Sequence, residues 1–279
     1  MFLIIFTILI LSFFFTITKK KKNIEEKFIN NNLNIQVKAI GKGKKIIMID
    51  NFLKEPNKHI NKIKENLNTQ ISQKKISHYP GIRIPTDKNL NHEISRFLEY
   101  IATKYYNKNI VKYTIPYDSS GYSIVNFTNK QLNYGSIFPH RDCQRCGDSI
   151  YSGLACVIYL CNTTREYNGT GFYEIKCPIN KKIFYTDKKY EKACKALREY
   201  EENIQYCTDK EEHIFEKIYE VDAKINRIVI YPTNYYHQGI INPEYYNDEN
   251  NIRDDRYTYT GFIFFENLKV DKNDMEESD

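Results

Sequence analysis

Seven short β-rich runs lie between Gly121 and Phe265, and they constrain the fold of the chain more than any other feature. β-Branched and aromatic residues fill each run, and glycine, proline or asparagine stands between one run and the next. Many short strands of this kind predict a sandwich or a barrel. The predicted strands are Gly121–Phe127, Tyr151–Leu160, Gly171–Ile175, Ile218–Val221, Arg227–Tyr231, Tyr235–Ile241 and Tyr257–Phe265.

Helical patterns flank and interrupt this β-rich region. A helical stretch is predicted from Asp50 to Ile71, and a second helix, capped by Asp87, carries apolar residues from Leu90 to Ile101. Both are expected to pack on a sheet without contributing chemistry. Residues 186–217 have one apolar stripe and one charged face, which predicts a helical insertion across the β-core. A covering helix is favoured there over a lid.

Residues 1–22 are predicted to be a membrane anchor with a basic flank. Residues 2–18 are apolar and uncharged, and Lys19 to Lys22 follow directly. Such a helix spans roughly 25 Å, slightly less than a hydrocarbon core of about 30 Å. No basic residue precedes the apolar run and no good cleavage site ends it, which favours a single-pass anchor over a signal peptide. The lysines favour a cytosolic location for the following domain.

Composition sets the other boundaries. Residues 23–45 are polar and rich in Lys and Asn, which predicts a tether between the membrane and a single folded domain at residues 46–270. Residues 271–279 are acidic, which predicts a disordered tail. The net charge of +6 comes without a basic and aromatic pattern, so no nucleic-acid partner is expected.

Asparagine and cysteine motifs bear on the compartment. Asn-x-Thr triplets at Asn126, Asn162 and Asn168 leave a lumenal location open, although such triplets arise by chance in a chain this rich in Asn. Seven cysteines cannot all pair internally, and free thiols suit a reducing compartment. Cys143 and Cys146 form a Cys-x-x-Cys without a second such pair, which favours two loop cysteines over half a zinc site or a redox pair.

The motif with the clearest chemistry is His140-Arg141-Asp142. In a strand, residues two apart leave the same face, so an imidazole and a carboxylate would stand side by side. These are two of the three protein ligands of a mononuclear iron(II) site. His237 is the best third ligand, because it follows the buried strand that Pro232 ends and lies on the next predicted strand. His59 and His92 are predicted to lie on the outer parts of helices.

A carboxylate-binding pair follows on the last strand. Arg256 begins this strand, and Thr258 lies two residues on and therefore on the same face. If the site uses 2-oxoglutarate, the planar fork of Arg256 suits the far carboxylate of that cosubstrate. Otherwise Arg256 is a surface residue beside Arg253 and Asp254. Apart from the metal ligands, no catalytic residue is assigned.

Together these motifs resemble the iron(II)- and 2-oxoglutarate-dependent oxygenases, in the prolyl 4-hydroxylase-like branch. The likeness extends over about residues 120–266 and is strongest to the uncharacterised DUF6445-type subfamily. The residues that carry it are Tyr122-Ser123-Ile124-Val125, Phe138-Pro139-His140-Arg141-Asp142, Tyr159-Leu160, Gly169-Thr170-Gly171-Phe172-Tyr173, Asn226 to Pro232, His237 and Arg256.

The resemblance implies a double-stranded β-helix, or jelly roll, with N-terminal helices and a helical insertion. It also implies iron(II) on His140, Asp142 and His237, and Tyr159 beside a bound 2-oxoglutarate. With O2, such an enzyme hydroxylates a protein side chain or small molecule and releases succinate and CO2. A silent membrane-anchored binding module and a metal enzyme that does not use 2-oxoglutarate stay open as alternatives. The substrate is not readable from the sequence.

Overall fold

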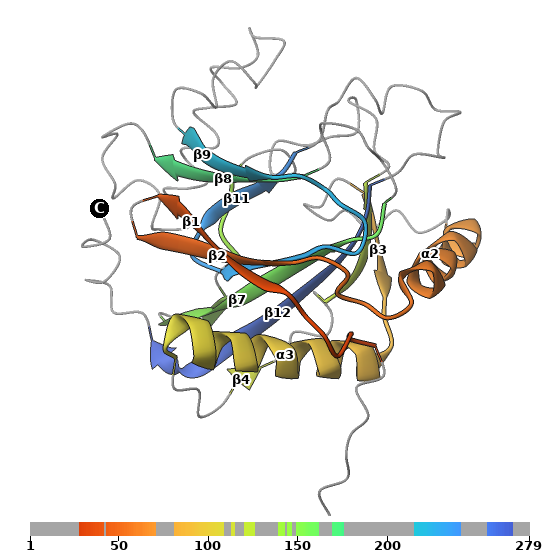
Figure 1. Ribbon diagram of the computed structural model, residues 1–279, viewed down its shortest axis with the longest axis horizontal. Helices are drawn as coiled ribbons and strands as arrows, with labels where there is room; N and C mark the ends of the chain where they lie inside the picture. Colours follow the sequence, from red (N-terminus) through yellow and green to blue (C-terminus); the bar gives the residue numbers. More distant parts are fainter. Residues whose placement is uncertain are drawn as a thin grey trace, which may run out of the picture.

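The computed structural model describes two antiparallel β-sheets and two helices (Figure 1). The prediction of a mainly β chain with flanking helices is therefore confirmed for the described residues. These are residues 28–41, 43–70, 81–108, 113–114, 120–125, 139–142, 144–146, 149–161, 169–175, 215–240 and 256–269.

The larger sheet has the strand order β1-β2-β10-β7-β12-β5-β3, with β4 paired to β12 and β6 paired to β7. Every pairing within it is antiparallel. Its strands are β1 (Ile35–Gly41), β2 (Lys44–Ile49), β3 (Gly81–Pro85), β4 (Tyr113–Thr114), β5 (Gly121–Val125), β6 (Gln144–Cys146), β7 (Ser149–Tyr159), β10 (Ile228–Pro232) and β12 (Arg256–Lys269).

The smaller sheet has the order β11-β8-β9 and lies across from the larger one (Figure 1). Its strands are β8 (Thr170–Ile175), β9 (Phe215–Val221) and β11 (Tyr236–Gly239). An antiparallel bridge between His140 and His237 adds the segment of residues 139–142 beside β11. The seven β-rich runs of the sequence thus correspond to strands β5 and β7–β12.

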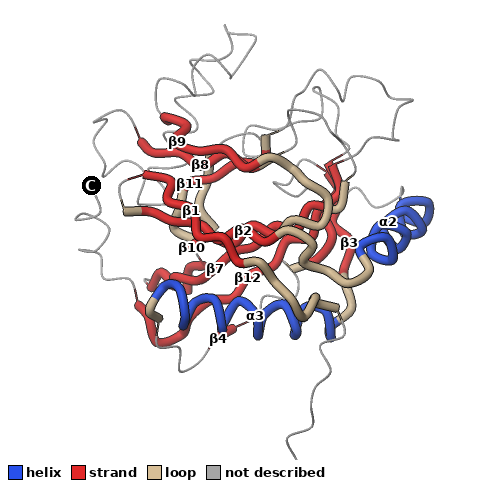
Figure 2. Tube along the Cα trace, in the orientation of Figure 1, coloured by secondary structure: helices blue, strands red, loops and turns tan. Residues whose placement is uncertain are grey.

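Both helices belong to the N-terminal part of the chain. The helix α2 (Pro56–Gln70) lies near β3 at the edge of the larger sheet (Figure 2). The longer helix α3 (Lys88–Tyr106) runs along the face of that sheet which points away from the smaller sheet. Asp87 caps α3 as predicted, since its carboxylate accepts a hydrogen bond from the Asn89 backbone N–H at 2.8 Å.

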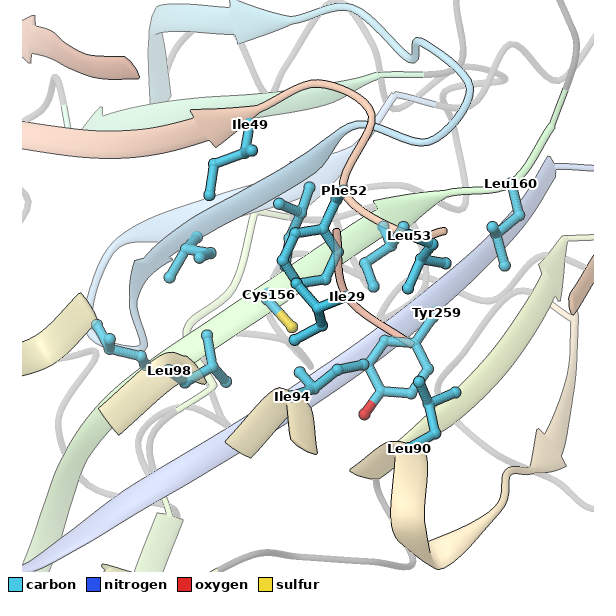
Figure 3. Packing of buried hydrophobic residues seen from close by; sticks show 14 of the residues in the cluster. Ile29, Ile49, Phe52, Leu53, Leu90, Ile94, Leu98, Cys156, Leu160 and Tyr259 are labelled. Carbon is cyan, nitrogen blue, oxygen red and sulfur yellow. The ribbon is translucent and has the colours of Figure 1, made fainter. Parts of the chain in front are cut away.

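Two apolar cores flank the larger sheet, and β12 contributes to both. Tyr257, Tyr259 and Ile263 pack in the core beneath α3, where Figure 3 shows Tyr259 near Leu90 and Ile94. Phe262 and Phe264 pack in the core shared with the smaller sheet. This alternation is the period of two of an extended strand buried on both faces. By the same period, Arg256 and Thr258 belong to the face that points toward the smaller sheet.

The Asn226-Arg227 pair ties the start of β10 to the chain that follows β2. Asn226 has a left-handed backbone with φ 62°, and its side chain both accepts from Leu53 N–H at 2.7 Å and donates to the Leu53 carbonyl at 2.9 Å. Arg227 forms a forked pair with the Asp50 carboxylate, with N–O distances of 2.7 and 3.2 Å. Lys224 adds a third contact to Asp50 at 2.8 Å.

The ion pairs of Asp50 predict that the free energy of unfolding depends on pH in the acid range. Hydrogen bonds from Arg227 lower the pKa of Asp50 from 3.8 to about 2. The stabilisation is therefore fully present above about pH 4 and is lost as the pH falls through 2. We expect Asp50→Asn to cost on the order of 1 kcal/mol at pH 6 and nearly nothing at pH 2, as measured by urea unfolding. Glu65→Gln, at an exposed position of α2, is the control. An equal Asp50→Asn cost at both pH values would contradict the prediction.

The structure corrects several boundaries. The predicted tether at residues 23–45 contains β1 and the first residues of β2, so the folded domain begins earlier than expected. The helical stretch predicted from Asp50 begins only at Pro56. Residues 215–217, the end of the predicted insertion, lie in strand β9.

The position of His59 is also corrected. It was expected on an outer helix face, but it is 5% exposed and its Nδ1 lies 2.6 Å from the Tyr122 hydroxyl. His59 precedes the buried Ile63 by four residues, and this spacing puts both on the same face of α2.

Other predictions lie outside the described residues. These are the anchor at residues 1–22, the insertion up to residue 214 and the tail at residues 271–279. Among the described helices, neither is long and apolar enough to cross a membrane.

Candidate metal centre

His140, Asp142 and His237 come together between the ends of two segments far apart in sequence. Their potential ligand atoms all lie within 4.8 Å of one another. The Asp142 carboxylate lies beside both imidazoles, with its oxygens 3.7 Å from His140 Nε2 and 3.1 Å from His237 Nε2. Adjacent donors on a metal with bonds of about 2.1 Å are roughly 3 Å apart, so the spacing suits a single ion.

Backbone pairing aligns the two segments that carry these side chains. His140 and His237 exchange N–H···O hydrogen bonds, both of 3.0 Å, and Asp142 N–H donates to the Thr233 carbonyl at 2.9 Å. On the other face, the Arg141 guanidinium lies 4.2 Å from the Tyr236 ring centre and donates to its hydroxyl at 2.6 Å. Arg141 thus fastens the short His-x-Asp segment to β11 without entering the centre.

The His237 ring is held with one nitrogen toward Asp142. Its Nδ1 lies 3.1 Å from the Tyr235 carbonyl, which can only accept a hydrogen bond. Nδ1 therefore carries the proton, and Nε2 is the nitrogen available to a metal. The Tyr231 ring packs against the imidazole with its centre 4.6 Å away, which further restricts rotation.

The surroundings of Asp142 favour the charged form of its carboxylate. Burial alone would raise the pKa of the Asp142 carboxyl, but His237, His140 and Arg83 outweigh it and hold the pKa below its usual value. Burial alone would lower the pKa of His237, yet the nearby Asp142 carboxylate raises it. The ionised carboxylate is the form that binds a cation.

Exposure differs strongly among the three residues and leaves one side of the centre open. The side chains are 8% exposed for His237, 19% for Asp142 and 44% for His140. A bound ion would therefore contact His237 on its buried side, and solvent would reach the ion near His140. Two imidazoles and one carboxylate with open positions form the donor set that suits iron(II).

Arg256 lies inside the protein beside the strand that carries His237. It is 4% exposed, and its guanidinium donates to the Gly169 carbonyl at 3.1 Å. A Cβ on Gly239, two residues after His237, would stand 3.4 Å from the guanidinium. The alternative of a surface arginine is therefore wrong, because Arg256 is buried against β11.

Thr258 and Tyr159 add hydroxyl groups to the buried surroundings of Arg256. They are directly paired across β12 and β7, and both are fully buried. Tyr159 donates to the Thr170 hydroxyl at 2.7 Å, and Arg256 lies 5.8 Å from the Tyr159 ring centre. Thr258 donates to the Ser123 carbonyl at 3.4 Å. The arrangement gathers one cation and several hydroxyls in a buried position.

Sequence reasoning missed three contributors to the centre. Gly169 and Gly239 lie against Arg256, and Thr233 supplies the carbonyl that accepts from the Asp142 backbone N–H. Gly239 could have been noticed as the small residue two positions after His237, on the same face of the strand. Phe138 and Cys143, on either side of the His-x-Asp segment, lie outside the described residues.

Comparison with known families gives one match. The model of a family described as "Family of unknown function (DUF6445)" matches residues 31–263. The matched span starts inside the predicted tether and includes the three candidate metal ligands and Arg256. No curated protein matches the chain.

Proposed function

The chain belongs to the DUF6445 family, and from that starting point we propose that it is an iron(II)- and 2-oxoglutarate-dependent dioxygenase. The observation that carries the proposal is the convergence of His140, Asp142 and His237 on one point with an open side. This donor set is typical of iron(II) oxygenases.

The order of the strands supports a double-stranded β-helix for the core. From β5 onward the chain visits the larger sheet, residues 139–142 beside β11, the larger sheet again at β7, and then β8 and β9. It returns to the larger sheet at β10, crosses to β11 and ends on β12. This passage between two antiparallel sheets is what a jelly roll requires, and it joins the two halves of the metal centre.

Arg256 is the proposed partner of the cosubstrate. Its buried guanidinium can form two parallel hydrogen bonds with the far carboxylate of 2-oxoglutarate, and Thr258 lies on the same strand face. The neighbouring Thr170 hydroxyl, which accepts from Tyr159, keeps its own hydrogen for another acceptor. Burial strengthens such contacts because water does not compete for the carboxylate.

The positions of these residues define separate roles for the protein and for the cofactors. When bound, iron(II), 2-oxoglutarate and O2 supply the oxidation of a substrate C–H bond to an alcohol, with release of succinate and CO2. His140, Asp142 and His237 hold the metal, and the Tyr235 carbonyl keeps the His237 proton on Nδ1. Arg256 orients the cosubstrate, and the packed sheets exclude water from that side.

The test is formation of succinate by the full chain in detergent with iron(II), 2-oxoglutarate and O2. We expect His140→Ala to reduce succinate formation to the level without protein, because one of three metal ligands is lost. His92→Ala, at an exposed position of α3, is the matched control and should behave as wild type.

Two outcomes separate the alternatives. Equal succinate formation by wild type and His140→Ala would contradict the proposed centre. Iron bound by wild type but not by His140→Ala, with no succinate formed even when candidate substrates are supplied, would favour a silent binding module.

A further inference from the structure

The side of the barrel on which the metal centre lies is defined by the edges of the two sheets. On one side, β1 of the larger sheet contacts β9 of the smaller sheet, and the Lys38 ammonium lies 5.7 Å from the Tyr219 ring centre. At the opposite edges stand β3 in the larger sheet and residues 139–142 in the smaller one. Strand β3 and the metal-binding segment therefore share the same side of the molecule.

Arg83 is the central residue of β3, and the strand register places its side chain. It pairs directly with Ser123 of β5, and Ser123 pairs with Thr258 of β12. Directly paired residues of antiparallel strands point to the same face. Arg83 consequently lies on the inner face, in one row with Thr258. Ser123 and Thr258 are fully buried, whereas Arg83 is exposed, so the row leads from the core to the solvent.

Arg83 stands at the solvent end of this row, on the side of the molecule where the metal-binding segment lies. With a divalent metal and a doubly negative cosubstrate bound, the charges of metal, Asp142, Arg256 and 2-oxoglutarate cancel. Arg83 then adds positive charge at the rim of a centre that is otherwise neutral.

We propose that Arg83 binds a carboxylate of the substrate, so that the substrate is acidic next to the carbon that is oxidised. The inference rests on the proposed function and deepens it by naming the class of substrate. A guanidinium suits this task because its planar fork takes a carboxylate with two hydrogen bonds, and at an exposed edge it does so without a prior burial cost.

Binding of a labelled peptide tests the inference without turnover. The full chain in detergent is loaded with Mn(II) and 2-oxoglutarate, and fluorescence anisotropy measures binding of a fluorescein-labelled peptide of eight glutamates. We expect clear preference over the matching glutamine peptide, and Arg83→Gln should weaken glutamate-peptide binding about tenfold or more. The affinity of Arg83→Lys for the glutamate peptide should lie between those of wild type and Arg83→Gln. Arg96→Gln, an equal loss of charge at an exposed position of α3, should bind as wild type.

A competition arm identifies the source of the carboxylate. Displacement of the peptide by free N-acetylglutamate at the same carboxylate concentration would indicate a small carboxylic acid, and no displacement would indicate an acidic peptide. Either result supports the inference if it depends on Arg83. Equal binding of the glutamate and glutamine peptides, or equal losses in Arg83→Gln and Arg96→Gln, would overturn it.

Equilibrium dialysis of Mn(II) on the same samples separates this inference from the proposed function. If wild type fails to bind Mn(II), the proposed function fails. If Mn(II) binds and the peptide result does not depend on Arg83, only the substrate inference fails.

Discussion

Replacing Asp142 with asparagine should lower the affinity for iron(II) by about two orders of magnitude or more. Loss of an outer partner of a metal ligand alone costs roughly 10- to 100-fold, and Asp142 is the only anionic member of the donor set. The amide has the same shape as the carboxylate, so packing against His237 is retained and the loss reports on charge and ligation. Anaerobic equilibrium dialysis with iron(II) measures the change.

His237→Ala provides the second arm of this experiment. It removes the most buried ligand and should lower iron affinity as strongly as Asp142→Asn does. His92→Ala should leave iron affinity unchanged. Because His237 packs on Tyr231, circular dichroism must show that the variant is folded. Wild-type iron affinity in a folded Asp142→Asn or His237→Ala variant would refute the assignment of the centre.

Replacing Arg256 with alanine should weaken 2-oxoglutarate binding about a hundredfold. Truncating one partner of a buried, hydrogen-bonded charge pair costs about 2–5 kcal/mol, largely because the other charge stays buried without its partner. Arg256→Lys keeps the charge but loses the fork, so an intermediate loss is expected. Calorimetry with Mn(II)-loaded protein measures the affinity.

The controls for Arg256 distinguish an effect on 2-oxoglutarate binding from an effect on metal binding. Arg96→Ala, at an exposed position of α3, should bind 2-oxoglutarate as wild type. Mn(II) affinity in the absence of cosubstrate should be the same in Arg256→Ala and wild type. If 2-oxoglutarate affinity does not change in Arg256→Ala, Arg256 does not bind the far carboxylate of 2-oxoglutarate, and Arg253 is the next residue to replace.

The β-rich half of the fold was predictable because its strands are buried. Strand β10 reads as an unbroken apolar run ended by Pro232, since both of its faces contact apolar cores. Strand β1 was missed for the opposite reason. Four of its central residues are exposed, and its short alternation of apolar and polar residues from Ile35 to Ala39 does not stand out in a stretch rich in Lys and Asn. Strand β3 was hidden behind a Pro-Gly pair that indicates a break in the chain.

The candidate centre was predictable where its chemistry is local. His140 and Asp142 are two residues apart, and His237 stands out at the end of a buried strand. What surrounds Arg256 was not predictable, because the Gly169 carbonyl and Gly239 come to lie against it only through the pairing of β8 and β11. The same holds for Arg83, whose place opposite the centre depends on the edges of two sheets rather than on any motif.

The hydrogen bonds between His140 and His237 have a thermodynamic consequence. Within the described part of the chain, the backbone of residues 139–142 pairs with β11 through the single His140–His237 bridge, and the Arg141–Tyr236 contact supports this pairing. An ion that binds both histidines can do so only when this bridge is formed, so ligation and strand association are linked functions. Each stabilises the other by the same free energy. If the proposed centre binds an ion, the order of this edge of the smaller sheet would therefore depend on occupancy, and the ion would stabilise the edge as well as take part in the reaction.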